Sequence, residues 1–222
     1  MMAKHTKPVL FFLIILILTA SLFTSAAAQP APTTAGGFNS QFNGSMAGWA
    51  TMGAVKMDVN SNYLYATGLE GYWSQAYYKN ATFSNFTYTV LMKRLYDQQR
   101  PNCLYVRMGT SLLKKTNKWY PGYAFCYRNY GQVGVFKQTF AGDVPLQNWK
   151  QSDAVIKMGW NTLKVVANGA TMKFYVNNTL VSTVKDGTRS RGYVGIGMYD
   201  DGVHGDQLRV DWAKLSTLPL AP

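Results

Sequence analysis

The sequence predicts an all-β fold in which two antiparallel sheets pack as a jelly-roll sandwich. Short alternating or apolar runs, separated by Gly, Asn, Asp and Pro, recur along the chain. After the first 28 residues no stretch carries a sustained 3.6-residue apolar period, which a helix packed on a core would show. The remaining residues, 29–222, are a usual number for one sandwich domain.

The first 28 residues have the pattern of a secretory signal peptide. Lys4 and Lys7 precede an apolar run over residues 9–18, and residues 26–28 are three alanines suited to cleavage. An uncleaved membrane anchor is the alternative, but the run is about half of the roughly 20 residues that a spanning helix needs. We therefore expect an exported protein, extracellular or in the cell envelope, with no membrane span after cleavage.

The rest of the chain divides into a flexible leader at 29–37, one β-sandwich domain at 38–217 and a C-terminal tail at 218–222. Twelve or thirteen strands suit two packed sheets better than a small barrel. The predicted strands are 38–42, 54–59, 63–67, 72–78, 86–95, 103–109, 122–128, 132–139, 161–167, 170–176, 179–184, 192–199 and 207–215.

The three predicted strands between residues 161 and 184 form the clearest local pattern, a meander with one buried face. Their turns, Asn168-Gly169 and Asn177-Asn178, consist of residues that accept positive φ. Across the first turn, we expect Val165 opposite Met172 and Leu163 opposite Phe174. The outward face would carry threonines and Lys164, Lys173 and Tyr175, so we interpret this meander as scaffold.

The two cysteines of the chain, Cys103 and Cys126, are predicted to form a structural disulfide. Export permits such a bond. If strands 103–109 and 122–128 pair around a loop near Thr116, the two residues lie directly opposite each other. Opposed Cα atoms are then about 4.5–5.5 Å apart, within disulfide reach.

The chain is basic, with 22 Lys and Arg against 10 Asp and Glu and a formal charge of +12. Removal of a signal peptide that holds Lys4 and Lys7 would lower this charge by two. A positive field favours anionic partners such as an acidic polysaccharide. The alternative is an even spread of cations that only keeps the protein soluble, and no nucleic acid partner is expected.

The carboxylates do not form the pattern of a glycosidase. Such enzymes on this type of fold place two closely spaced carboxylates in one cleft, and no predicted strand here carries acids at i and i+2 or i+4. We therefore predict no catalytic residue. A glycoside hydrolase that uses Glu70 or an aspartate is one alternative. A structural protein that self-associates through exposed sheet edges is the other.

Asp200, Asp201 and Asp206 lie in a Gly-rich stretch and supply the only suggestion of a cofactor. Three carboxylates within seven residues could bind Ca²⁺. The alternative is an ordinary turn in which Asp side chains cap their own backbone.

The meander over residues 103–138 predicts a carbohydrate-binding surface on its face away from the core. Small residues there, Ala124, Cys126 and Gly134, leave room above the sheet. Trp119, on an adjoining loop, could overhang this face. Aromatic rings would stack on sugars, and the polar groups would bind hydroxyls or acidic groups. A solvated face, or one covered by a loop, is the alternative. The predicted binding residues are Tyr105, Arg107, Trp119, Arg128, Gln132 and Phe136.

Several short stretches carry a resemblance to a known superfamily. They are Phe42-Asn43-Gly44 with Trp49, Leu104-Tyr105-Val106-Arg107, Gly122-Tyr123, Trp160-Asn161-Thr162-Leu163-Lys164, Phe174-Tyr175-Val176-Asn177 and Gly192-Tyr193-Val194-Gly195-Ile196. In these the chain resembles the concanavalin A-like lectin/glucanase superfamily, in its laminin-G-like and 3-keto-disaccharide hydrolase-like branch. The resemblance implies a sandwich and places Arg107 in a cleft. The hydrolase-like branch usually has an acid after its Gly-Tyr pair, where this chain has Ala124. The prediction is a secreted, non-catalytic β-sandwich that binds carbohydrate or another extracellular polymer.

Overall fold

The computed structural model describes residues 36–53, 57–60, 62–67, 70–96, 99–200 and 206–219. The chain separates into two units, 1–31 and 32–222, and all described residues belong to the second. The predicted signal peptide and residues 29–35 of the predicted leader lie outside the described residues. Gly37, the last residue of that leader, already belongs to the first strand. None of the described residues forms a helix that could cross a membrane.

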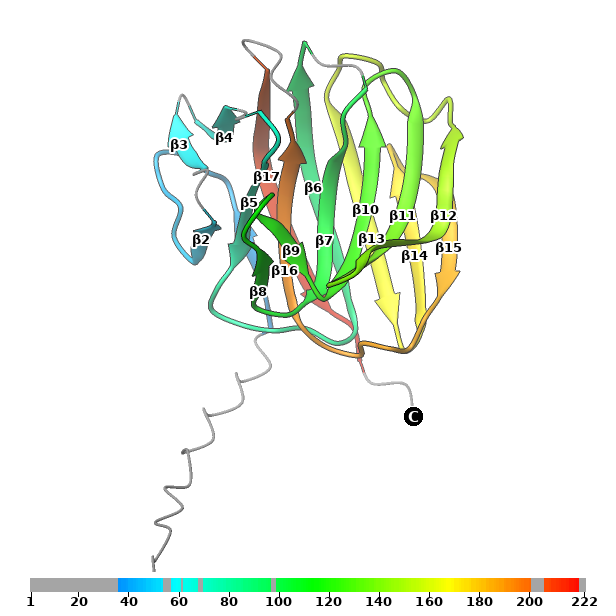
Figure 1. Cartoon of the computed structure of the whole chain (residues 1–222). Coiled ribbons are helices and arrows are strands. Elements are labelled where there is room, and N and C mark those ends of the chain that lie inside the picture. The colour runs from blue at the N-terminus through cyan, green and yellow to red at the C-terminus, as the bar shows by residue number, and fades with distance from the viewer. Residues whose placement is uncertain are drawn as a thin grey trace, which may run out of the picture. The chain divides into compact units, whose positions relative to one another are not determined.

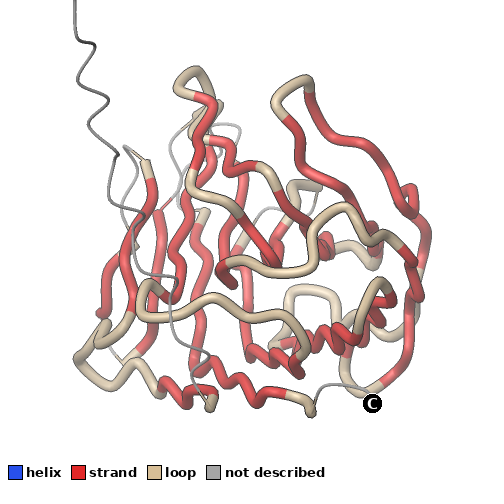
Figure 2. The backbone as a smooth tube through the Cα atoms, turned by 90° about the horizontal axis from the view of Figure 1, so that it is seen from below, coloured by secondary structure: helices blue, strands red, loops and turns tan. Residues whose placement is uncertain are grey.

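The described residues form strands and no helices (Figures 1 and 2). One sheet has eight strands: β1 (Gly37–Ser40), β3 (Asp58–Asn60), β4 (Tyr63–Thr67), β6 (Phe86–Leu95), β13 (Asn161–Asn168), β14 (Thr171–Val176), β15 (Thr179–Lys185) and β17 (Gln207–Thr217). Their order is β15-β14-β13-β6-β17-β4-β3, and β1 also pairs with β17. All of these pairs are antiparallel.

The second sheet has seven antiparallel strands in the order β12-β11-β10-β7-β16-β5-β2. Their bounds are β2 (Trp49–Met52), β5 (Trp73–Tyr78), β7 (Asn102–Met108), β10 (Gly122–Arg128), β11 (Gln132–Thr139), β12 (Gly142–Gln151) and β16 (Tyr193–Tyr199). A separate hairpin consists of β8 (Ser111–Leu113) and β9 (Lys118–Tyr120).

The main core lies between the two large sheets. In β6 every second residue from Phe86 is buried, and the intervening residues are partly exposed. Its buried side chains meet those of the seven-stranded sheet, such as Leu104, Phe125 and Ile196, in one apolar cluster. Burial of apolar area drives this packing. The predicted all-β, two-sheet sandwich is therefore confirmed.

The meander at 161–185 has the predicted buried face but a different register. Val165 pairs with Phe174 and Leu163 with Val176, so the prediction was wrong by two residues. The turn consists of Gly169 and Ala170, because Asn168 still pairs with Thr171. A shift of two residues keeps the same side chains on the buried face. The second turn is as predicted, with positive φ at both of its asparagines.

Four strands were not predicted, and the longest is β12. It lies at the edge of its sheet, contains Pro145 and has irregular pairing with β11 on both sides of Val135. A proline and a bulge are tolerated at an edge, and both break the alternation that identifies a strand. The other three, β2, β8 and β9, have three or four residues each. Of the predicted strand 54–59, residues 54–56 lie outside the described part.

The predicted disulfide is present and joins β7 to β10. Cys103 lies directly opposite Cys126, with their Cα atoms 4.1 Å apart. Met108 departs from the simple alternation of strand 103–109, which would place it in the apolar face with Leu104. Opposite β16, β7 has one extra residue, and Arg107 there has φ of 53°. After a bulge, the side chains that follow point to the other face of the sheet than simple alternation predicts. Met108 therefore packs on the outer side, away from Leu104.

Asp186 fixes the connection between β15 and β16. Its carboxylate accepts hydrogen bonds from Lys137 Nζ at 2.8 Å, Tyr123 Oη at 2.7 Å and the backbone N of Thr188 at 2.8 Å. Burial raises the pKa of Asp186, but hydrogen bonds from Lys137, Thr188 and Tyr123 outweigh it and hold the pKa well below its usual range. Burial, together with the bond to Asp186, raises the pKa of Tyr123 to about 12, so its hydroxyl remains a donor.

Replacement of Asp186 by asparagine is expected to lower the free energy of unfolding by about 2 kcal/mol at neutral pH. Because the folded pKa lies below the unfolded value of about 3.9, the contribution of the carboxylate is present above that value and is lost as pH falls through the folded pKa. The difference between wild type and variant should therefore shrink between about pH 5 and pH 2. Urea unfolding across this range measures it, and a constant difference would contradict the assignment.

Candidate functional site

A second apolar cluster lies on the outer face of the seven-stranded sheet, away from the main core. Its buried members are Met52, Cys103, Tyr105, Met108, Trp119, Ala124 and Cys126. Partly buried residues pack against them, mostly aromatic: Trp73, Tyr77, Leu112, Phe136, Trp149 and Tyr193. This is the face on which the sequence predicted a binding surface.

The β8–β9 hairpin covers part of this face through Trp119. The indole is fully buried, and its ring centroid lies 5.5 Å from that of Tyr105 and 5.7 Å from that of Tyr77. Its Nε1 donates to the carbonyl of Gly109 at 2.8 Å. A Cβ at Gly195 would lie 2.5 Å from the indole, so only glycine admits the ring there. Tyr105 and Trp119 therefore lie beneath the surface, out of a ligand's reach while the hairpin is in place.

Arg107 was predicted to face a ligand, but its guanidinium is buried and bonded to the chain. Nε and Nη2 donate to the carbonyl of Ser84 at 3.2 and 2.7 Å, and Nη1 donates to that of Arg189 at 3.1 Å. Burial lowers its pKa. The three bonds join β7 to two connecting segments. Arg107 thus acts as a structural link in the observed geometry.

The other three predicted residues, Arg128, Gln132 and Phe136, remain partly exposed on the outer face. They adjoin Trp149 of β12, which sequence reasoning did not select because β12 itself was missed. With Tyr130 from the β10–β11 turn they form one surface, which we call the aromatic strip: Arg128, Tyr130, Gln132, Phe136 and Trp149.

Stacking and hydrogen bonds hold the strip together. The guanidinium carbon of Arg128 lies 3.9 Å from the centroid of the Trp149 ring, a cation–π contact. The ring centroids of Phe136 and Trp149 are 5.3 Å apart. Gln132 Oε1 accepts from Arg128 Nη1 at 2.9 Å and from Tyr130 Oη at 2.8 Å. Nε of Arg128 is buried and has no hydrogen-bond partner among the described residues.

Gly134 leaves room for the rings of Phe136 and Trp149, because it has no side chain. A Cβ at this position would lie 2.8 Å from the Phe136 ring and 3.2 Å from the indole of Trp149. Contacts below 3.0 Å require a shift, so any larger residue would push Phe136 off the sheet. Glycine lets both rings lie close to the backbone between β10 and β12.

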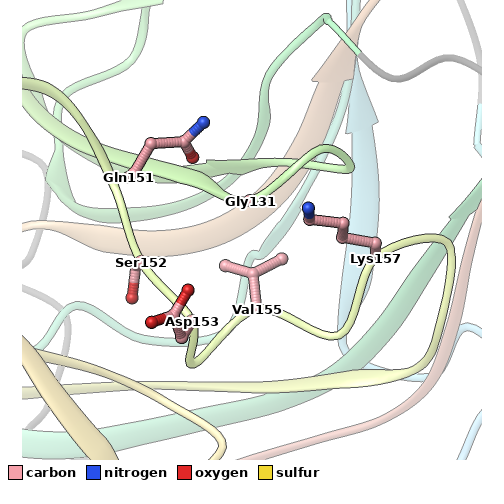
Figure 3. A pocket seen from close by; sticks show the side chains of 6 residues that line it. All are labelled: Gly131, Gln151, Ser152, Asp153, Val155 and Lys157. Carbon is pink, nitrogen blue, oxygen red and sulfur yellow. The ribbon is translucent and has the colours of Figure 1, made fainter.

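A polar pocket of about 530 Å³ adjoins the strip (Figure 3). Gln151 of the pocket pairs with Gln132 of the strip, and Ser152 N donates to the carbonyl of Gly131 at 2.8 Å. In Figure 3 the Lys157 amine points toward Gly131, which has φ of 104°. The lining residues are Gly131, Gln151, Ser152, Asp153, Val155 and Lys157. The pocket thus offers both a cation and a carboxylate beside the aromatic rings.

The strands of the seven-stranded sheet contain one carboxylate, Asp143 on β12. It forms an ion pair with Lys118 of the hairpin. Burial and then the charge of Asp143 raise the pKa of Tyr105 well above its usual range, so this phenol is neutral. A glycosidase pair needs two carboxylates about 5–10 Å apart. The described strands of this sheet supply one.

The predicted calcium ligands do not form a cluster among the described residues. The carboxylate of Asp206 accepts from Arg94 Nε at 2.8 Å and also from Nη2, with both side chains fully buried. Asp201 lies outside the described residues. No group of three or more His, Cys, Asp or Glu side chains that could hold a metal occurs in the described ranges. Calcium binding therefore stays a prediction.

Comparison with known proteins places the chain in a family. The model of the family described as 3-keto-alpha-glucoside-1,2-lyase-like domain matches residues 37–211. The chain belongs to this family. The family supports the resemblance stated from the sequence and the coarse prediction of a carbohydrate-related β-sandwich. A search of curated proteins finds no match.

Three solved structures that resemble this 3-keto-alpha-glucoside-1,2-lyase-like domain are distant from it in sequence. The β-glucanase of Bacillus licheniformis superposes with a TM-score of 0.65 at 14% identity, covering 84% of this chain and 100% of that one. The carbohydrate-binding module CBM66 from Bacillus subtilis gives 0.57 at 18%, covering 77% and 96%. A protein of unknown function with a galectin-like fold, also from Bacillus subtilis, gives 0.62 at 12%, covering 83% and 96%. At these identities the likeness shows the fold alone.

Proposed function

We propose that this protein is exported and binds a glycan chain at the aromatic strip without cleaving it. The observation that carries the proposal is Arg128, which is stacked on Trp149 while its Nε has no partner. A donor without an acceptor is costly, so Arg128 has hydrogen-bonding capacity to spare, and the part of its side chain that remains exposed can donate to a hydroxyl or acidic oxygen of a sugar. Because the stack already fixes the guanidinium, binding loses little side-chain entropy.

Two further features support a glycan as ligand. Phe136 and Trp149 present partly exposed apolar surface, on which the C–H face of a pyranose packs. The adjoining pocket has the volume of a small-molecule site and is lined by an amide, a hydroxyl, a carboxylate and an amine. A sugar on the strip would therefore have a polar subsite for its neighbour. The carbohydrate-binding module and β-glucanase among the structural neighbours agree with this choice.

Glycan cleavage is the second candidate, and the family itself favours it. Asp143 is the carboxylate that such a reaction would use on this sheet, but its ion pair with Lys118 leaves it without the second acid of a glycosidase. Turnover of glycosides that is lost in Asp143→Asn would establish this alternative in place of binding alone.

Substitutions in the strip test the proposal directly. We expect Arg128→Ala and Trp149→Ala each to weaken polysaccharide binding by about 2 kcal/mol, roughly thirtyfold, because each removes a stacked or charge-assisted contact. Glycan arrays select the ligand, and isothermal titration or pull-down with that polysaccharide measures the loss.

Phe140→Ala is the matched control, because Phe140 is an exposed aromatic residue outside the strip, at the β11–β12 turn. It should leave binding unchanged. The proposal fails if the Arg128→Ala, Trp149→Ala double variant binds like wild type, or if Phe140→Ala loses as much.

A further inference from the structure

The outer face of the eight-stranded sheet carries a group of cations that sequence reasoning treated as scattered. Alternate residues of β6 and β13 point away from the core, as their burial patterns show. The sequence indicated Lys164, Lys173 and Tyr175 on this face. Pairing with β6 and β17 adds more cations to it. The resulting cationic face consists of Lys93, Lys164, Lys173, Lys185, Arg209 and Lys214.

Strand register brings these cations close to one another. Lys93 of β6 lies directly opposite Arg209 of β17. Lys164, Thr89 and Lys214 occupy one row across β13, β6 and β17. Because neighbouring strands are about 4.8 Å apart, the Cα atoms of Lys164 and Lys214 are about 10 Å from each other. Like charges at such spacing repel, which destabilises the sheet unless an anion or solvent screens them.

Aromatic rings hold three of the cations in place. Lys164 Nζ lies 4.4 Å from the centroid of Tyr175, and Lys214 Nζ lies 4.4 Å from that of Trp212. The guanidinium carbon of Arg209 lies 5.9 Å from the ring of Tyr63. Such contacts attract a cation electrostatically and limit its side-chain freedom. The charges are therefore presented in fixed positions above the sheet.

Carboxylates do not neutralise this face. The strands of the sheet contain two, Asp58 and Asp211, against the six cations. Across the part of the chain that the structure describes, none of the six cations forms an ion pair with a carboxylate. The positive charge of the chain is thus partly concentrated here, on the face opposite the aromatic strip.

We propose that the cationic face binds a linear anionic polysaccharide through its acidic groups. The cations extend across five neighbouring strands without enclosing a pocket, so they match a chain that carries repeated charges better than a single small anion. A polyanion would also relieve the repulsion between Lys93 and Arg209. This second surface is separate from the proposed glycan site, since it lies on the other sheet.

Two other polyanions fit the face less well. Single-stranded nucleic acid binds by stacking its bases on aromatic rings, but here Tyr175 and Trp212 already lie beneath lysines. A bilayer surface would require apolar side chains for insertion. Among the described residues, the exposed large aliphatic side chain on this face is Leu180 of the edge strand β15, 49% exposed.

The test compares two triple variants with the same charge change. Lys93→Gln, Lys164→Gln and Lys214→Gln remove three of the six charges of the cationic face, whereas Lys79→Gln, Lys114→Gln and Lys115→Gln remove three exposed lysines that lie outside it. The probe is polygalacturonate, with dextran as its neutral counterpart, at about 0.02 M and about 0.2 M salt. Wild type should bind polygalacturonate and not dextran, with affinity that falls as salt rises. The first triple variant should bind about tenfold or more weakly at low salt, and the second should stay within about twofold.

Other measurements keep the outcomes distinct. Arg128→Ala should leave polygalacturonate binding on the cationic face in place, so failure of the aromatic strip and failure of this face are separable. Thermal unfolding should show that the first triple variant folds at least as well as wild type, because repulsion is removed. Three outcomes overturn the proposal: wild-type binding by the first triple variant, an equal loss in the second, or binding of single-stranded DNA or phosphatidylglycerol vesicles without binding of polygalacturonate.

Discussion

Replacement of Asp206 by alanine is expected to lower the free energy of unfolding by about 3–5 kcal/mol. Asp206 and Arg94 form a fully buried ion pair between the start of β17 and β6. Removing the carboxylate takes the Asp206 ion pair away from a guanidinium that stays fully buried. Arg94 Nη1 would still donate to the carbonyl of Tyr199 at 2.7 Å, but a carbonyl does not neutralise a buried cation.

Urea unfolding of Asp206→Ala at neutral pH measures this loss. Asp153→Ala provides the control, because Asp153 is exposed and its removal should change stability by no more than about 0.5 kcal/mol. A double variant, Arg94→Met with Asp206→Leu, should recover part of the loss, since replacing both ions by apolar side chains leaves neither charge of the pair buried. A loss below about 1 kcal/mol for Asp206→Ala would show that the buried pair is not a major determinant of stability.

Local pattern was sufficient to predict much of the fold. The pairing of β10 with β11 follows from the short turn at residues 129–131, which sets Arg128 opposite Gln132 and Cys126 opposite Gly134. The disulfide followed from the next pairing, between β10 and β7. In each case one buried face and a short connection determine the register, because a slip by one residue would expose the apolar set.

The candidate site was only partly accessible to sequence reasoning, because nonlocal contacts decide it. Arg107 has the alternation of an outward residue, but the extra residue in β7 turns its guanidinium toward the carbonyls of Ser84 and Arg189. Trp149 lies on a strand that Pro145 and irregular pairing conceal. Trp119 is buried because Gly195, about 75 residues away in the chain, leaves room for its ring.

The cationic face shows the same limit. Lys93 and Arg209 are far apart in the chain, and only the pairing of β6 with β17 places them opposite each other. Charge counted along the sequence appears evenly spread, since the lysines of β6, β13, β14 and β17 are separated by many residues. The sheet gathers them because alternate residues of every strand point to the same side. A prediction of binding surfaces from the sequence therefore needs the strand order first.

Trp119→Ala is expected to lower the free energy of unfolding by about 3–5 kcal/mol, comparable to the loss at Asp206. The indole fills the space above Gly195 and contacts Tyr105 and Tyr77, so truncation leaves a large cavity under the β8–β9 hairpin. The carbonyl of Gly109 also loses its donor. Urea unfolding measures the loss, and amide hydrogen exchange at residues 111–120 should show that the hairpin opens more often.

Trp149→Ala is the informative comparison, because the two tryptophans lie on the same face of the same sheet. Trp149 is only partly buried, at a sheet edge, so its truncation should cost about 1–2 kcal/mol of stability while removing most glycan affinity. Trp119→Ala should do the opposite: a large loss of stability, with glycan affinity of the folded fraction within about threefold of wild type. If Trp119→Ala instead abolished binding at unchanged stability, the hairpin would be part of the glycan site. The aromatic strip would then have to extend beneath it, toward Tyr105, as the sequence first suggested.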